Sequence, residues 1–312
     1  MNEIYIVFPD WMRVEADCKK RTTRHYLGNG KIIWNVIKDK KLPHYDHIEF
    51  ASDNAAGILS YGADKNGKLK LFLHAIYPQL RLNPNNTYGS FFANFETSYN
   101  LFSGENSDEE KLLRIEIDEF GITLISKTKR LEITRSYVSS KRSFAVSEKI
   151  SIKNIYGKDL ELKVANLNGL KYSEKDKGYQ GKVYRYGCKI ILNNKERTAF
   201  TTPLAEKATK TFYAVYFAEE KRKTYDPETD FLDRENYVNT MKECLSIITP
   251  DDTVNKLCEM AKVRACESIF KTKNGYMHAP GGGHYYAAVF TNDQGEYIMP
   301  YFGYCGYELA KN

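Results

Sequence analysis

The feature that most constrains this chain is a two-residue hydrophobic alternation, which runs from Ile4 to about Phe217 in short segments separated by turn residues. The clearest pair, Leu112–Ile117 and Ile122–Ser126, is joined by four residues ending in Gly121 and predicts a β-hairpin. The predicted strands are Ile4–Phe8, Lys31–Ile37, His47–Ser52, Leu69–Ile76, Tyr88–Phe95, Leu112–Ile117, Ile122–Ser126, Leu131–Val138, Ser143–Ile152, Leu160–Asn166, Cys188–Leu192 and Thr211–Ala218. So many strands with almost no helical period predict a mainly β protein, a large antiparallel sandwich of two broad sheets.

The pattern changes after Phe217. Tyr225–Asp230 is typical of a turn or linker, and Leu232–Leu245 follows as a predicted helix. Residues 249–253 then carry a helix start signal, with acids placed near the positive end of the helix dipole. An apolar stripe continues to a predicted helix end near Phe270, through Val254, Leu257, Cys258, Ala261, Ala265, Ser268 and Ile269. The chain therefore divides into a β-sandwich at 1–220, a linker with a helix at 221–250, and the start of a helical domain at 251–312.

Composition and charge narrow the function classes. Hydrophobic residues make up 42% and charged residues 28%, a profile typical of a soluble globular protein. The net charge of +6 is spread along the chain rather than gathered on one segment, which argues against a nucleic-acid partner. No apolar run is long enough to span a membrane, and the N-terminus lacks the pattern of a signal peptide. We expect a cytoplasmic protein, or a secreted one if a leader has been removed.

The six cysteines form no CxxC pair, and no Cys/His spacing fits a zinc site. Scattered cysteines in a chain of this length indicate reduced thiols. His278 and His284 flank three glycines and invite a metal interpretation, but the sequence offers no third ligand beside them. We therefore expect neither a metal nor another cofactor, and interpret the two histidines as groups that order the loop or contact a ligand.

The chemistry is concentrated in one stretch, Gly275–Tyr307. Gly281–Gly283 permits backbone conformations closed to other residues and lets a ligand approach closely. An aromatic run then leads to Asn292 and Asp293, and a helix starting there would place Glu296 on the same face as Asp293. The glycines are not a phosphate-binding loop, because no GK[ST] follows them.

The order of a capped helix, a glycine-rich loop, an aromatic run and Asn292-Asp293 resembles the first hairpin of the six-hairpin glycosidases, glucoamylases among them. The resemblance implies an (α/α)6 barrel preceded by a β-supersandwich and a connecting helix. In glucoamylase-like members the aromatic segment ends in Arg-Asp, and the Asp lies in the subsite of the non-reducing sugar. Asn292 stands here in place of the Arg, which puts the identity of the bound sugar in doubt.

The resemblance implies the N-terminal part of a glycoside hydrolase acting on an oligo- or polysaccharide. Asp293 would accept hydrogen bonds from sugar hydroxyls, as carboxylates do. The implied substrate-binding residues are Asp293, Asn292, Tyr286, His284 and Glu296. Glycoside hydrolysis needs two carboxyl groups, an acid and a base or nucleophile. In this family both come from later hairpins, so we expect this truncated chain to be inactive alone.

Alternatives stay open for the chain and for its residues. The sandwich alone would suit a non-catalytic carbohydrate-binding or protein-interaction module. The chain would otherwise be a catalytically dead fragment whose exposed C-terminal helices pair with a partner or a second copy. Asp293 can equally serve as the N-terminal acid of a helix, and Glu296 as a solvated acid. Tyr286 suits an aromatic core as well as a sugar platform.

Overall fold

The computed structural model describes residues 25–82, 89–96, 99–103, 109–167, 169–173, 181–272, 275–278 and 302–303. Its strands are β1 His25–Gly28, β2 Lys31–Asn35, β3 His44–Ala51, β4 Ala56–Ala63, β5 Leu69–Arg81, β6 Ser90–Phe95, β7 Tyr99–Phe102, β8 Lys111–Ile117, β9 Ile122–Lys127, β10 Leu131–Ser139, β11 Ala145–Asn154, β12 Leu160–Asn166, β13 Lys171–Tyr172, β14 Arg185–Leu192, β15 Lys195–Arg197, β16 Ala199–Leu204, β17 Thr209–Glu219, β18 Ile269–Thr272 and β19 Gly275–His278. The helices are a 3₁₀ turn η2 at Val36–Lys38, α1 at Pro227–Cys244 and α2 at Asp252–Cys266. The chain is therefore mainly β, as the alternation predicts.

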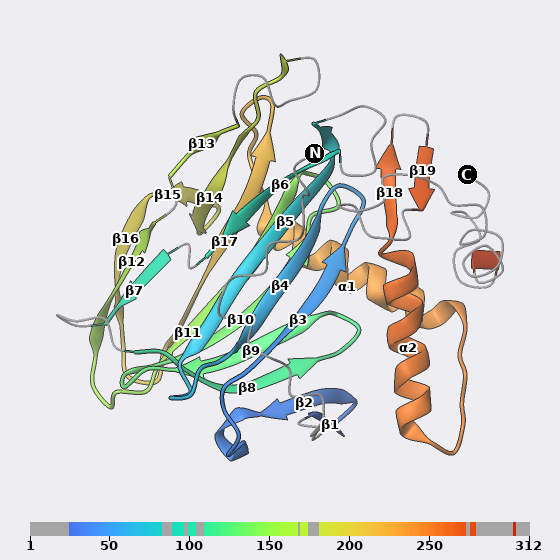
Figure 1. Ribbon diagram of the computed structural model, residues 1–312. Coiled ribbons are helices and arrows are strands. Elements are labelled where there is room, and N and C mark those ends of the chain that lie inside the picture. The colour runs from blue at the N-terminus through green and yellow to red at the C-terminus, as the bar shows by residue number, and fades with distance from the viewer. Residues whose placement is uncertain are drawn as a thin grey trace.

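Two layers form a sandwich; α1 packs against β10 and β11, and α2 lies beside the sandwich (Figure 1). One layer is a ten-stranded sheet with the order β1-β2-β8-β9-β10-β11-β17-β14-β13, in which β15 pairs with β14. The second layer is divided into a four-stranded sheet, β3-β4-β5-β6, and a three-stranded sheet, β16-β12-β7. Every strand pairing is antiparallel. The prediction of two broad sheets is thus right for one layer only, because β6 and β7 do not pair with each other.

Some strand predictions are corrected by the structure. The strand predicted at Lys31–Ile37 ends at Asn35, where η2 begins. β4 has no counterpart among the predictions, because all eight of its residues are buried and its sequence therefore lacks an alternating polar face. The hairpin over Asp118–Gly121 is confirmed, with Asp118 N donating to Gly121 O over 3.0 Å. The strand predicted at Ile4–Phe8 lies outside the described residues.

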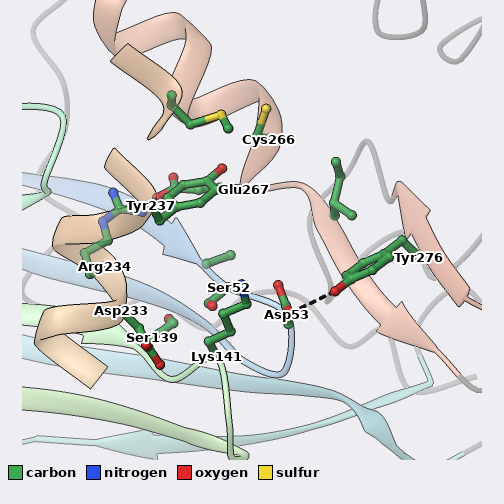
Figure 2. Close-up of a pocket in the computed structure, with 13 residues that line it drawn as sticks. Ser52, Asp53, Ser139, Lys141, Asp233, Arg234, Tyr237, Cys266, Glu267 and Tyr276 are labelled. Atoms are coloured by element: carbon green, nitrogen blue, oxygen red, sulfur yellow. Dashed lines mark hydrogen bonds and ion pairs between the residues drawn. The ribbon is translucent and has the colours of Figure 1, made fainter. Parts of the chain in front are cut away.

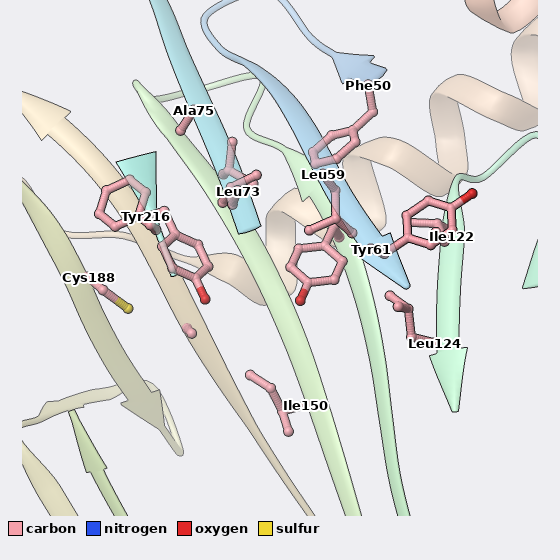
Figure 3. Close-up of a cluster of buried hydrophobic side chains, with 14 of the residues drawn as sticks. Phe50, Leu59, Tyr61, Leu73, Ala75, Ile122, Leu124, Ile150, Cys188 and Tyr216 are labelled. Carbon is pink, nitrogen blue, oxygen red and sulfur yellow. The ribbon is translucent and has the colours of Figure 1, made fainter. Parts of the chain in front are cut away.

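One hydrophobic cluster holds the layers together (Figure 3). Side chains from both sheets meet there, and those labelled in Figure 3 include Phe50, Leu59, Tyr61 and Leu73 from the four-stranded sheet and Ile122, Leu124 and Ile150 from the ten-stranded sheet. The three-stranded sheet adds Leu162, Val164 and Leu204 to the same cluster. Each fully buried aliphatic side chain contributes about 1.5–3 kcal/mol, so this cluster is the main source of stability in the sandwich.

A charged network lies inside this core. Arg135 and Glu148 are 3% and 1% exposed. Each charge therefore needs an opposite charge and hydrogen bonds to offset the free-energy cost of its burial. Arg135 donates to the Glu110 carboxylate, with Nη2 to Oε2 at 2.9 Å, and its Nε lies 3.4 Å from Glu148 Oε1. The hydroxyls of Tyr137 and Tyr216 donate to the two Glu148 oxygens over 2.8 and 2.6 Å. Every charge in the network therefore has a partner.

Gly62 in β4 shows how closely β3 and β4 approach each other. A Cβ atom at Gly62 would overlap the carbonyl oxygen of His44 and the backbone of Tyr45, neither of which can rotate away. Gly62→Ala should therefore lower the free energy of unfolding by about 1–3 kcal/mol, measured by urea titration. Gly169→Ala is the matched control, because a Cβ atom there meets open space. Equal stability of the two variants would contradict the proposed overlap.

Candidate functional site

Helix α1 connects the sandwich to the helical region, and its N-terminus is stabilised by hydrogen bonds between residues close in sequence. Asp226 caps it by accepting from Thr229 N over 3.2 Å, and Pro227 occupies the first helical position, where no N–H is needed. The helix begins five residues before the predicted start at Leu232, because the turn signal over Tyr225–Asp230 is in fact this cap and the first helical turn. α1 therefore begins close to the end of β17.

Buried polar contacts dock α1 on the ten-stranded sheet. Asp230, which is 4% exposed, accepts from the hydroxyls of Ser140 and Ser147 over 2.6 and 2.7 Å. Burial raises the pKa of Asp230, although the two serine hydrogen bonds work in the opposite direction. Arg142 adds a two-pronged ion pair to Asp233 at the surface, over 2.7 and 2.9 Å. One face of α1 is thus polar and matched to serines on β11 and the preceding turn.

Arg234 of α1 contacts both the sandwich and the end of α2. Its guanidinium donates to the carbonyls of Glu119 and Phe120 over 2.8 and 2.7 Å, in the confirmed hairpin turn. The same group pairs with Glu267, which also forms an ion pair with Arg264, with Nη1 at 2.7 Å. Arg234 and Glu267 are both buried. One arginine therefore joins the sandwich, α1 and the end of α2.

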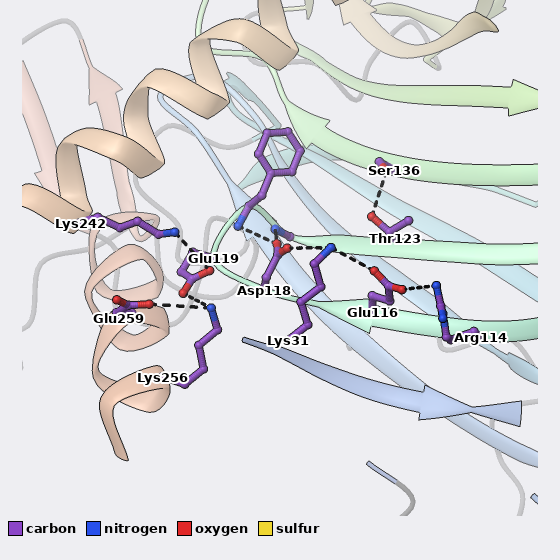
Figure 4. Close-up of polar contacts among 12 residues, drawn as sticks. Lys31, Arg114, Glu116, Asp118, Glu119, Thr123, Ser136, Lys242, Lys256 and Glu259 are labelled. Atoms are coloured by element: carbon purple, nitrogen blue, oxygen red, sulfur yellow. Dashed lines mark hydrogen bonds and ion pairs between the residues drawn. The ribbon is translucent and has the colours of Figure 1, made fainter. Parts of the chain in front are cut away.

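The Glu119 carboxylate makes a second link from this turn to the helices (Figure 4). It pairs with Lys256 of α2 and lies 3.8 Å from Lys242 Nζ of α1. A hydrogen bond to Glu119, together with burial, raises the pKa of Glu259 on α2. Burial acts to raise the pKa of Glu119 as well, but the bonds from Glu259 and Lys256 outweigh it and lower the value. Glu259 therefore holds a proton more readily than Glu119 does.

The first part of the apolar stripe predicted on the second helix does not face the core, although its last member, Ile269, is buried. Val254 and Leu257 are 41% and 66% exposed, whereas Val263 and Cys266 are buried. The buried positions pack with Val238 and Met241 of α1, and with Ile269, Phe302 and the partly buried Tyr237 and Tyr276. The predicted helix end near Phe270 is also wrong, because α2 ends at Cys266 and β18 begins at Ile269. The short β18–β19 hairpin leads directly into the glycine-rich stretch.

A cavity of about 200 Å³ lies where the sandwich, both helices and the β18–β19 hairpin meet (Figure 2). The β3–β4 turn supplies Ser52 and Asp53, and the turn after β10 supplies Lys141. The helices and the hairpin supply Asp233, Arg234, Tyr237, Met241, Cys266, Glu267, Ile269 and Tyr276. The cavity thus combines carboxylates, cations and two tyrosine rings, and its polar groups could orient a bound ligand.

Asp53 is a weakly paired polar group of this cavity. Its carboxylate receives one side-chain hydrogen bond, from the Tyr276 hydroxyl over 3.4 Å. Burial raises the pKa of Asp53, and the ammonium of Lys141 counteracts part of that effect. A carboxylate that loses water without gaining strong donors is the kind of group found at functional sites.

The loop that carries Asp53 is nevertheless fixed. Gln79 Nε2 donates to the Asp53 carbonyl over 2.9 Å and to the Lys271 carbonyl over 2.7 Å. Lys271 N also donates to the Asp53 carbonyl over 3.0 Å, and Asn54 Nδ2 donates to the Lys141 carbonyl over 2.5 Å. The backbone of this turn is therefore held by β5, by β18 and by the turn after β10.

The substrate-binding residues predicted from the sequence all lie outside the described residues, namely Asp293, Asn292, Tyr286, His284 and Glu296. His278 is described and buried, with its ring 6.1 Å from that of Phe302. Among the described residues, no group of three His, Cys, Asp or Glu side chains is placed to hold a metal ion. In the same part of the chain, no helix has both the length and the apolar character needed to cross a membrane.

Sequence reasoning missed Asp53, Lys141 and Gln79 as members of a site. Ser52-Asp53-Asn54 carries an ordinary turn signal, and nothing in it points to a contact with Lys271, 192 residues from Gln79. Their importance follows from the packing of the helices on the sandwich, which a single sequence does not encode locally.

Comparison with known proteins gives a fold but no family. No family model matches the chain, and no curated protein matches it. Among solved structures, the chain is similar to one described as "Putative kojibiose phosphorylase from human microbiome", with a TM-score of 0.53 and 9% identity. The similarity covers 92% of this chain and 48% of that one, so this chain spans about half the length of that protein. The comparison therefore shows that the chain shares its fold with about half of a protein described as a phosphorylase.

Proposed function

We propose that this chain is the N-terminal part of a carbohydrate-active enzyme, comprising a β-supersandwich, a connecting helix and the opening of an (α/α)6 barrel. The observation that carries the proposal is the extent of the structural similarity. A match over 92% of the chain cannot be confined to the sandwich, which ends at Glu219, and so includes helical residues. The described order of sandwich, α1 and α2 is also the order that the six-hairpin resemblance implies.

In this proposal the stretch after β19 forms one wall of a sugar site. Asp293 accepts hydrogen bonds from sugar hydroxyls, with Asn292, Tyr286, His284 and Glu296 beside it. The general acid and base come from helical hairpins outside this sequence, and the reaction is cleavage of a glycosidic bond. The name of the structural neighbour adds phosphate to water as a candidate acceptor of the glycosyl group. The exposed Val254 and Leu257 of α2 support further helices or a second copy packing there.

Titration of the 312-residue chain with D-glucose, maltose and kojibiose in a calorimeter tests the proposal. We expect binding without turnover, and neither free glucose nor sugar phosphate should form when inorganic phosphate is added. Asp293→Ala should weaken binding about tenfold or more, because hydrogen bonds to a carboxylate are worth about 1.5–3 kcal/mol each. The matched control is Asp46→Ala, at an acid of β3 whose side chain is 43% exposed.

Two results would contradict the proposal. Turnover of a glycoside by this chain alone would show that its catalytic groups are already present. Absence of heat with every sugar would instead favour the alternative of a protein-interaction module, which the exposed apolar residues of α2 also suit. Sedimentation then tests whether the chain associates with itself.

A further inference from the structure

The sandwich also presents a carboxylate to the cavity, independently of the stretch that carries Asp293. Asp53 lies on a turn whose backbone is bonded to Gln79 and Lys271. Among the described residues, one other side chain donates to its carboxylate, the Tyr276 hydroxyl over 3.4 Å. A structural aspartate in such a turn normally caps backbone N–H groups, as Asp118 does for Phe120 and Gly121. The Asp53 carboxylate points to the cavity instead (Figure 2).

The size and chemistry of the cavity select the ligand. Its volume of about 200 Å³ suits a single sugar ring rather than a drug-sized molecule, for which pockets of about 300–1,000 Å³ are usual. The carboxylates of Asp53, Asp233 and Glu267 outnumber the cations of Lys141 and Arg234, which disfavours an anion.

Neutral hydroxyl groups, by contrast, can form hydrogen bonds with both the carboxylates and the cations of the cavity. They can donate to Asp53 and accept from Lys141, while the rings of Tyr237 and Tyr276 supply apolar lining for the carbon atoms of a sugar. Arg234 and Glu267 are already paired with each other, and Glu267 also pairs with Arg264, so they line the cavity without being available to recognise a ligand.

We propose that Asp53, with Lys141 and Tyr276, forms a binding site for one sugar ring, in which Asp53 accepts hydrogen bonds from ligand hydroxyls. The site is built by the sandwich and the β18–β19 hairpin together. It rests on the proposed function in one respect, since that function supplies carbohydrate as the ligand class.

Calorimetry with D-glucose and kojibiose on the full chain tests this assignment. Asp53→Asn should raise the Kd about tenfold or more, because the amide lacks the charge that strengthens these hydrogen bonds. The melting temperature should stay the same or rise, since the substitution removes a partly buried charge with one weak partner. Asp46→Asn changes an acid of β3, the strand that precedes the Asp53 turn, and lies outside the cavity lining, so it should change neither quantity.

The outcomes distinguish the Asp53 sugar site from the proposed function of the chain. If Asp53→Asn leaves the Kd unchanged while Asp293→Ala raises it, the cavity site is wrong and the proposed function stands. If no sugar binds to the unaltered chain, both are wrong. If Asp53→Asn lowers the melting temperature, Lys141→Met decides, because this exposed side chain can be removed without disturbing the fold. A raised Kd then supports the site, and an unchanged Kd overturns it.

Discussion

Replacing Arg135 by methionine should lower the free energy of unfolding by about 3–5 kcal/mol, because breaking a buried ion pair leaves an uncompensated charge. Glu148 would keep the two tyrosine hydroxyls but lose the cation beside it. Methionine retains most of the apolar length of arginine, so the change removes charge rather than volume. Urea or thermal unfolding of the purified chain gives the value.

The double variant Arg135→Met/Glu148→Gln isolates the electrostatic part of this loss. Glutamine is neutral and still accepts a hydroxyl, so the double variant should recover part of the stability that Arg135→Met loses. Lys163→Met is the matched control, because Lys163 pairs with Glu161 at the surface, where such pairs contribute little. If the double variant is less stable than Arg135→Met, the loss comes from packing and our electrostatic interpretation is wrong.

Replacing Arg234 by methionine should lower the free energy of unfolding by about 3 kcal/mol. The Glu119 and Phe120 carbonyls would lose their donor, and the buried Glu267 would lose one of its two cations. The remaining pair with Arg264 places this prediction at the lower end of the range for buried ion pairs. Limited proteolysis should show faster cleavage between β17 and α2, because α1 loses its link to the hairpin turn.

Arg142→Met provides the contrast for this variant. Arg142 also joins the sandwich to α1, but through an exposed pair with Asp233. We expect unchanged proteolysis and an unchanged melting temperature, because solvent screens an exposed ion pair. Equal effects of Arg142→Met and Arg234→Met would show that burial does not determine the strength of these links.

The sequence predicts the β class of this chain well, because a strand with one face towards solvent alternates apolar and polar residues. Leu131–Val138, for example, lies within β10, whose odd-numbered positions from Leu131 to Tyr137 are buried. β4 lacks this alternation, since both of its faces are covered. The same limit explains the second helix, where apolar spacing predicts a buried stripe through Leu257 although α2 buries Val263 instead. Periodicity identifies a helix, but its neighbours decide which face is covered.

The candidate site is less predictable than the fold for a related reason. Asp293 and its neighbours are marked by a local pattern, whereas Asp53 becomes notable only when residues far apart in sequence surround it. Tyr276 lies 223 positions from Asp53. Turn residues are frequent in any β protein, so Asp53 could not be separated from the other turn aspartates by its sequence alone.

The hydrogen bonds that Ser140 and Ser147 donate to Asp230 affect where the chain can be truncated. A fragment that stops at Glu219 would retain all strands of the three large sheets, yet Ser140 and Ser147 would lose their acceptor. The carbonyls of Glu119 and Phe120 would likewise lose the guanidinium that covers them. A cut at residue 220 would therefore remove buried contacts between the sandwich and α1. Helix α1 is in this sense part of the folded sandwich, and a β portion expressed alone should include it.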